Sequence, residues 1–318
     1  MDSFRARRRK EKEKVVVVMG ATGTGKSRLS IDLATRFPAE IVNCDKMQVY
    51  DGLDIVTNKV TEEEKCGVPH HLLGVVDPDK EFTATDFRHL ASLSMESILG
   101  KDRLPIIVGG SNSYIKALVN CDDDLEFGSK YECCFLWVDV DLPVLDSFVS
   151  ERVDRMVELG LVDEVRRMFE PKADYSRGIR RAIGVPEMNW YLLSEATAGE
   201  ETRARLLEAA INDIKINTCK LARRQLQKIH RLRTLWERNV LVHRLDAKVH
   251  RLDATDVFLK RGGDADETWE KLVAGPSTMI VGQFLCNENI APSSPLPLPP
   301  PLPLRSWGRP YVQVAATY

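Results

Sequence analysis

Apolar runs alternate with segments of helical spacing along the first 140 residues of the chain. The runs that predict strands lie at residues 15–19, 41–42, 104–108 and 133–139. The segments with apolar residues at three- and four-residue steps are 27–37 and 82–99. Strands that alternate with helices in this way predict an α/β fold with a doubly wound parallel sheet.

The pattern changes after this region, and the changes suggest how the chain is divided. Helical spacing dominates from 142 to 236, a short apolar run at 240–245 favours a strand that returns to the sheet, and 257–273 favours a last helix. The segments we expect are a charged arm (1–14), an α/β core (15–140), a mainly helical substrate lobe (141–238), a return to the core (239–285) and a proline-rich, disordered tail (286–318).

The first strand leads directly into a phosphate-binding motif. Gly20-Ala-Thr-Gly-Thr-Gly-Lys-Ser27 fits the pattern G-x-x-x-x-G-K-[ST] between a predicted strand and a predicted helix. Its glycines let backbone N–H groups approach an anion, and the helix that follows aims its positive end at the same point. Lys26 adds a point charge, and the Ser27 hydroxyl is a typical ligand for Mg²⁺ on a phosphate. We therefore expect a P-loop NTPase-like core.

An aspartate follows the second predicted strand. Because ligands of open α/β sheets bind at the carboxyl ends of the strands, Asp45 is expected to face the same crevice as the phosphate loop. There it could hold Mg²⁺ or accept a proton from an attacking group. Asp139, at the end of a later strand, is a second candidate for Mg²⁺.

Composition narrows the class of protein without naming its substrate. The 318 residues are 43% hydrophobic and 29% charged, with a net charge of −2, as in a soluble globular protein with no global field for nucleic acid or membranes. The seven cysteines include no C-x-x-C pair, which favours reduced thiols. Lys and Arg far outnumber the two acids between residues 215 and 251, which predicts an anion-binding surface.

Several blocks, taken together, resemble one enzyme family. They are Gly20–Ser27, Asn43–Tyr50, Gly52–Ile55, Thr57–Lys59, Val68–Leu72, Gly109–Ile115 and Gly178–Glu187. In this order they are similar to the isopentenyltransferases that make cytokinins in plants, and the resemblance covers about residues 14–285. The tRNA dimethylallyltransferases belong to the same family and share its fold and mechanism.

The resemblance implies that the loop holds dimethylallyl diphosphate and that an adenine nucleotide is the acceptor. The N6 amine of adenine attacks C1 of the allyl group, diphosphate leaves, and Mg²⁺ is the expected cofactor. Asp45 matches the general base, Thr22 the threonine at the bridging region of the diphosphate, and Lys26 the loop lysine. The residues expected at the diphosphate are Gly20, Ala21, Thr22, Gly23, Thr24, Gly25, Lys26 and Ser27, with Ser27 as the metal ligand.

The acceptor phosphates require cations elsewhere in the chain. The segment Thr218–Gln225 is similar to the T-R-x-x-A-K-R-Q block of the tRNA enzymes, with Cys219 in place of its first arginine. Lys220, Arg223 and Arg224 share one face of the predicted helix, and with Arg181 they are the candidates for the acceptor phosphates. The basic excess favours ADP or ATP over AMP, while the choice between the plain and the hydroxylated prenyl donor stays open.

Three other interpretations remain at this point. A tRNA dimethylallyltransferase would prenylate an adenine of an anticodon loop, a small-molecule kinase would bind ATP at the loop, and a non-catalytic protein would recruit partners through its proline tail. We expect a monomer with small-molecule substrates, without a stable nucleic-acid or membrane partner. The compartment is the plastid or the cytoplasm, with the cytoplasm preferred because Glu11 and Glu13 are untypical of a transit peptide.

Overall fold

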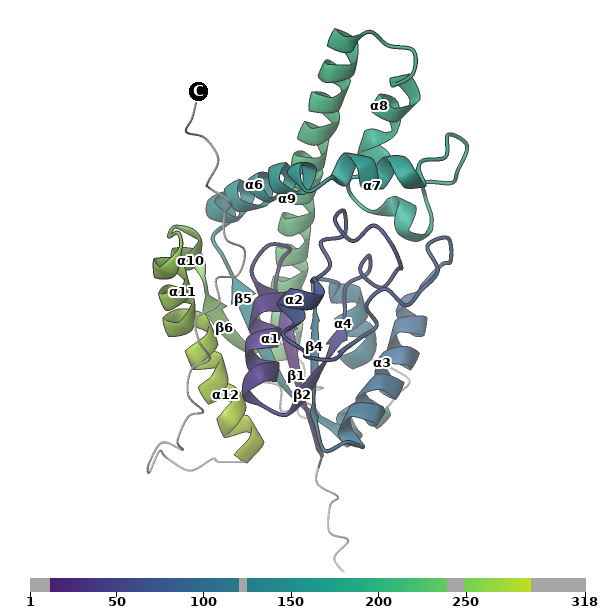
Figure 1. Cartoon of the computed structure of the whole chain (residues 1–318). Coiled ribbons are helices and arrows are strands. Elements are labelled where there is room, and N and C mark those ends of the chain that lie inside the picture. The colour runs from purple at the N-terminus through teal and green to yellow at the C-terminus, as the bar shows by residue number, and fades with distance from the viewer. Residues whose placement is uncertain (1–11, 120–124, 239–248, 287–318) are drawn as a thin grey trace, which may run out of the picture.

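The computed structural model describes residues 12–119, 125–238 and 249–286, and a parallel sheet organises this part of the chain (Figure 1). In sheet order its strands are β3 (His70–His71), β2 (Ala39–Asn43), β4 (Leu104–Gly109), β1 (Glu13–Met19), β5 (Tyr131–Asp139) and β6 (Val249–Asp253). Every pairing is parallel, and β1 lies between β4 and β5. The doubly wound α/β fold expected from the sequence is confirmed.

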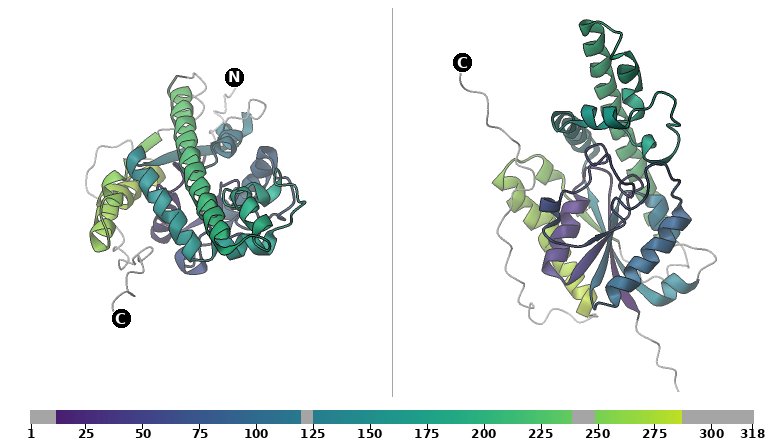
Figure 2. Two further views of the ribbon diagram at one scale, coloured as in Figure 1. Left: turned by 90° about the horizontal axis from the view of Figure 1, so that it is seen from above. Right: turned by 45° about the vertical axis from the view of Figure 1, so that its right-hand side comes forward.

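Helices cover both faces of the sheet (Figure 2). One face packs against α3 (Ala84–Leu99), α4 (Asn112–Val119) and the C-terminal half of α9 (Glu200–Arg238), and the other against α1 (Lys26–Arg36), the start of α6 (Leu142–Glu158) and α12 (Gly275–Cys286). Val15 and Val17 of β1 belong to the first core and Val16 and Val18 to the second. A strand buried on both faces must be apolar at every position, which explains its unbroken run of valines.

A mainly helical lobe rises beyond the carboxyl ends of the strands (Figures 1 and 2). It contains α6, α7 (Leu161–Met168), α8 (Asn189–Ser194) and two short 3₁₀ turns, Gly178–Arg181 and Pro186–Met188. The 39-residue helix α9 is about 58 Å long at 1.5 Å per residue, so it spans the lobe and also lies against the sheet. The remaining short helices are α2 (Glu62–Lys65), α5 (Leu125–Lys130), α10 (Thr255–Phe258) and α11 (Gly263–Trp269).

Two expectations about the C-terminal part need revision. The strand expected at 240–245 lies outside the described residues, and the strand that returns to the sheet is β6 at Val249–Asp253. The single helix expected at 257–273 is wrong, because the Gly262–Gly263 pair separates α10 from α11 and Gly262 has φ +60°. A π-helical turn, Glu270–Ala274, then joins α11 to α12. Most of the predicted arm (1–11) and all of the tail beyond residue 286 lie outside the described residues.

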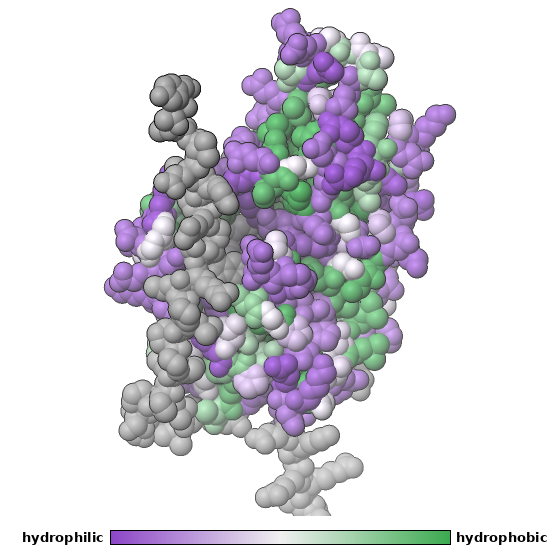
Figure 3. Space-filling model, in the orientation of Figure 1, coloured by the Kyte–Doolittle hydropathy of each residue, from purple (hydrophilic) through white to green (hydrophobic). Residues whose placement is uncertain are grey.

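Polar side chains cover most of the face shown in Figure 3, with smaller apolar patches between them. Single large apolar side chains are exposed on the helical lobe, among them Trp190 and Leu159. Among the described helices, none is both long enough and apolar enough to span a membrane.

Candidate active site

The phosphate loop takes the conformation that its glycines allow. Gly23 and Gly25 have φ of +86° and +90°, in the left-handed region that side chains disfavour, and α1 begins directly afterwards at Lys26. The Thr24 hydroxyl donates to the carbonyl oxygen of Ala21 at 3.0 Å, and Lys26 Nζ donates to the same oxygen at 2.6 Å. The turn therefore places a lysine and a helix N-terminus on one small concave surface.

This surface forms one wall of a cavity of about 260 Å³ at the carboxyl ends of β1, β2 and β4. The polar side chains that line the cavity include Thr22, Lys26, Ser27, Arg28, Asp45, Arg152 and Gln225, and also Ser30, Asn43, Gln48, Asn58, Glu64 and His70. The loop and Asp45 thus face the same space, as their positions at strand ends predict. A cradle for an anion and a carboxylate that can accept a proton share one cavity.

Local hydrogen bonds fix the orientation of Asp45. Its Oδ1 accepts from the backbone N–H groups of Met47 at 2.8 Å and Gln48 at 3.3 Å, and its own N–H donates to Asn43 Oδ1 at 3.2 Å. These bonds tie one carboxylate oxygen to the turn that follows β2. The carboxylate therefore has a defined direction relative to the cavity.

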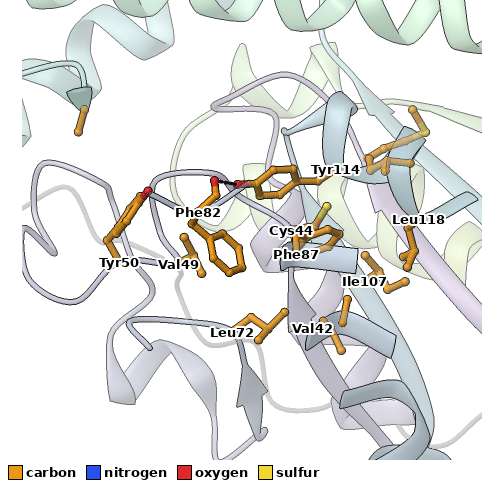
Figure 4. Close-up of a cluster of buried hydrophobic side chains, with 14 of the residues drawn as sticks. Val42, Cys44, Val49, Tyr50, Leu72, Phe82, Phe87, Ile107, Tyr114 and Leu118 are labelled. Carbon is orange, nitrogen blue, oxygen red and sulfur yellow. Dashed lines mark hydrogen bonds between the residues drawn. The ribbon is translucent and has the colours of Figure 1, made fainter. Parts of the chain in front are cut away.

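A buried aromatic cluster supports the segment that carries Asp45 (Figure 4). The Tyr114 ring stacks on Phe87 with centroids 4.6 Å apart, and its hydroxyl donates to the carbonyl oxygen of Phe82 at 3.1 Å. Burial raises the pKa of this hydroxyl above its ordinary range, so it stays protonated and keeps donating. Cys44, immediately before Asp45, is fully buried in the same cluster.

We expect Gly109→Ala to lower the free energy of unfolding by about 3 kcal/mol, at the upper end of overpacking costs. A Cβ at Gly109, the last residue of β4, would lie 2.1 Å from the backbone oxygen of Cys44, so β2 and β4 would have to separate. Chemical denaturation measures the change. Gly199→Ala is the control because a Cβ there meets nothing within 4 Å, and equal stability of the two variants would contradict the argument.

Two residues that sequence analysis does not assign complete the loop side of the cavity. Arg152 of α6 donates through Nη2 to Thr22 Oγ1 at 3.0 Å, and its buried Nε has no partner in the described part of the chain. Gln225 of α9 accepts from the Thr22 N–H at 2.7 Å and donates to the Gly110 oxygen at 3.0 Å. Gln225 ends the Thr218–Gln225 block, so the sequence carries a signal for it. Arg152 is one of two arginines on an amphipathic helix, and no motif distinguishes it from Arg155.

Burial disfavours the charged forms of two cations that line the cavity. Burial lowers the pKa of Lys26 to about 8, an effect that the Asp45 carboxylate opposes and the Arg152 guanidinium increases. Burial and the neighbouring charge of Arg155 lower the pKa of Arg152 to about 10, while Asp45 again opposes the shift. A bound anion would favour the charged forms of both residues and so offset the cost of their burial.

We therefore expect the affinity for inorganic pyrophosphate, measured with Mg²⁺ present, to fall as the pH rises through about 8. Above that pH the free protein has lost the Lys26 proton and must take one up on binding, which costs up to about tenfold in affinity per pH unit. Calorimetry from pH 7 to 9.5 measures the effect. Lys26→Met controls for the titration of pyrophosphate itself, and an identical pH dependence in both proteins would contradict the role of Lys26.

The basic residues expected at the acceptor phosphates do not all meet at the cavity. Lys220, Arg223 and Arg224 lie on the exposed side of α9, where Lys220 donates to Asn217 and Arg223 pairs with Asp146 at 2.5 Å. None of these three lines the cavity. Their role in binding the acceptor stays a prediction.

Arg181 lies in a different setting, close to the segment that carries Asp45. Burial lowers the pKa of Lys46, the residue after Asp45, and the charges of Arg181 and of Lys228 on α9 lower it further. Lys46 lies in the turn after β2, Arg181 in a 3₁₀ turn of the lobe and Lys228 on α9. Lys46 and Lys228 are absent from the candidates that the sequence provides.

The residues of the cavity fit a metal ion that enters together with the diphosphate. The Ser27 hydroxyl and the Asp45 carboxylate both line it and are hard oxygen donors. In the described part of the chain no group of three or more His, Cys, Asp or Glu side chains is placed to hold a metal. Asp139, the other candidate, accepts from Arg251 Nε at 2.8 Å and lines a separate cavity.

Comparisons with known proteins identify a family in which a phosphate loop is expected. The family model described as IPP transferase matches residues 48–127 and 121–231. The chain is 64% identical over 269 residues to adenylate isopentenyltransferase 5, chloroplastic, from Arabidopsis thaliana, which covers 84% of the chain and 78% of the relative. It is 33% identical over 382 residues to tRNA dimethylallyltransferase 2 of the same plant, covering 85% and 79%.

A solved structure gives the same result for the fold. The full-length tRNA isopentenylpyrophosphate transferase from Bacillus halodurans superimposes with a TM-score of 0.65 at 28% identity, covering 87% of this chain and all of that one. The two chains thus share the same overall fold. By sequence and by structure, the chain belongs to the IPP transferase family.

Proposed function

We propose that this enzyme transfers the dimethylallyl group of dimethylallyl diphosphate to N6 of the adenine of ADP or ATP, or of AMP, with release of diphosphate. The observation that carries the proposal is that the phosphate loop and Asp45 line the same cavity. The 64% identity to an adenylate isopentenyltransferase, against 33% to a tRNA dimethylallyltransferase, favours a mononucleotide as the acceptor.

The loop side of the cavity stabilises the leaving group. As the allylic C1–O bond breaks, the diphosphate gains negative charge, and donors already aimed at it lower the barrier. The backbone N–H groups of the loop, Lys26 and Arg152 supply these donors. The Thr22 hydroxyl, held by Arg152 at 3.0 Å, is placed to donate to a diphosphate oxygen.

Asp45 serves the acceptor. An exocyclic amine of a purine is a weak nucleophile, so loss of its proton to a positioned carboxylate assists the attack on C1. Oδ1 is engaged by the Met47 and Gln48 N–H groups, and Oδ2 is the oxygen that remains for the N6 proton. The new N6–C1 bond forms as the C1–O bond breaks, and the proton of N6 passes to Asp45.

Mg²⁺ would bind with the diphosphate. Ser27 would be its protein ligand, and the carboxylate of Asp45 lines the same cavity. The ion would supply further stabilisation of the leaving charge.

The acceptor phosphates are proposed to bind near Arg181. Its charge acts on Lys46, which follows the proposed base, and Lys228 acts on the same ammonium group. A cluster of cations beside the base suits a nucleotide whose adenine reaches Asp45. The additional phosphates of ADP and ATP would contact more of these cations than the single phosphate of AMP does. For this reason we prefer ADP or ATP as the acceptor.

The remaining assignments rest on the relatives. A monomer remains a proposal. A plastid location is proposed because the relative at 64% identity is named as chloroplastic, and the relatives give no support to the cytoplasmic preference. Expression of the chain fused to a fluorescent protein in leaf cells would test the location.

The reaction itself is tested with purified protein, dimethylallyl diphosphate and Mg²⁺, with AMP, ADP or ATP supplied separately. We expect mass spectrometry to find nucleotides that have gained one C₅H₈ group and kept all their phosphates, with diphosphate released only when donor and acceptor are both present. Turnover of ATP without the donor would overturn the proposal in favour of phosphoryl transfer.

A further inference from the structure

The C-terminal part of the described chain braces the phosphate loop. Trp269, the last residue of α11, is 3% exposed, and its indole lies against Gly25 of the loop. A Cβ built at Gly25 would lie 2.8 Å and 2.9 Å from two atoms of the indole ring, closer than any side chain could be. The ring is therefore a wall against the residue that immediately precedes Lys26.

Two residues of α1 hold this indole in place. Trp269 Nε1 donates to Asp32 Oδ2 at 2.7 Å, and the guanidinium carbon of Arg28 lies 4.7 Å from the ring centroid. Arg28 also pairs with Asp266 at 2.7 Å and lines the cavity. Gly25, at the N-cap of α1, and Arg28 and Asp32 within it are at helical spacing, so all three contact the indole from one face of the helix.

The segment after Trp269 adds a second point of attachment. Glu270 accepts from both terminal nitrogens of Arg36, at 2.9 Å and 2.6 Å, and Arg36 also donates to Thr278 at 2.9 Å. Glu270 begins the π-helical turn, a rare conformation that often occurs at functional sites. Residues 263–286 thus fasten along the whole of α1, outside the residues that the family model matches.

We propose that Trp269 is a positioning residue for diphosphate binding, and the proposal rests on the function proposed above for the loop. Glycines make the loop able to reach its anion-binding conformation but also free to leave it. A rigid wall at Gly25 restricts that freedom before the anion arrives, and preorganised donors bind more tightly. Removal of the wall should weaken diphosphate binding and leave the acceptor and the base unaffected.

The test compares two buried tryptophans with inorganic pyrophosphate as the probe, in the presence of Mg²⁺. Trp269→Leu is expected to raise the Kd for pyrophosphate and the KM for dimethylallyl diphosphate by about 10- to 100-fold, the scale of a small misplacement in a site. The KM for ADP should change little, because the variant does not touch the acceptor side of the cavity. Trp236→Leu is the matched control, since Trp236 is 6% exposed and packs on Phe135 away from the loop.

Two further variants separate positioning from simple loss of structure. Trp269→Phe keeps a ring beside Arg28 and should restore part of the affinity, and Asp32→Leu keeps the indole but removes its hydrogen bond, so it should weaken pyrophosphate binding by less than Trp269→Leu. Equal effects of Trp269→Leu and Trp236→Leu on Kd, or a rise in the KM for ADP as large as that for the prenyl donor, would overturn the proposal. If the wild type binds pyrophosphate but forms no prenyl product, the proposed function fails while this test still stands.

Discussion

Asp45→Asn is expected to lower kcat for prenyl transfer by about 10²–10⁴-fold, the contribution typical of a positioned general base. The amide keeps the shape of the carboxylate, and its oxygen can still accept from the Met47 and Gln48 N–H groups that now bond to Oδ1. It cannot take a proton from N6. The KM for dimethylallyl diphosphate should change little, because the loop that holds the diphosphate is untouched.

Steady-state kinetics with ADP as the acceptor measures the effect. Asp51→Asn is the matched control, since Asp51 lies in the same segment, is exposed, and accepts through Oδ1 from the Gly52 N–H at 3.0 Å. It should keep wild-type kcat. A kcat for Asp45→Asn within about threefold of wild type would remove Asp45 from the role of base.

Arg152→Met is expected to lower kcat/KM for the prenyl donor by about 10²–10³-fold, the usual cost of one preorganised donor to developing charge. Methionine keeps an unbranched apolar stem of similar shape, so α6 should still pack. The variant loses both the charge in the cavity and the hydrogen bond that holds the Thr22 hydroxyl at 3.0 Å. Pyrophosphate should also bind more weakly.

Kinetics and pyrophosphate calorimetry together check this result. Arg152→Lys should recover only part of the loss, since an ammonium cannot present the planar fork of a guanidinium. Arg167→Met, at an exposed position of the neighbouring helix α7, is the control and should behave as wild type. Wild-type affinity of Arg152→Met for pyrophosphate would show that Arg152 does not contact the diphosphate.

The parts of the fold that local pattern determines can be predicted from the sequence. The run of valines at 15–18 needs burial on both faces, and the glycines of the loop mark the turn between β1 and α1. The helix Ala84–Leu99 is equally clear, because Thr83 and Asp86 form a capping box before a periodic apolar face. Each of these elements carries its own signal.

The parts that depend on tertiary packing cannot be predicted in this way. Arg152 is one charged residue on an amphipathic helix, and only the packing of α6 over the loop turns it towards Thr22. Trp269 ends a short helix that begins at the Gly262–Gly263 pair, where the sequence predicts a single longer helix. Its contact with Gly25 joins residues 244 positions apart, which no local pattern can indicate. Three basic side chains of α9 illustrate the converse, since Lys220, Arg223 and Arg224 share an exposed face but do not line the cavity.

A free adenine nucleotide is the acceptor that we expect for the prenyl group. A competition experiment distinguishes it from tRNA, with ADP and an unmodified tRNA that contains the target adenine present together, limiting dimethylallyl diphosphate, Mg²⁺ and the wild-type enzyme. We predict that mass spectrometry of the separated products finds the C₅H₈ group on N6 of the nucleotide and none on the tRNA. Prenylated tRNA with unmodified ADP would contradict this expectation and assign the chain to the tRNA-modifying branch of its family.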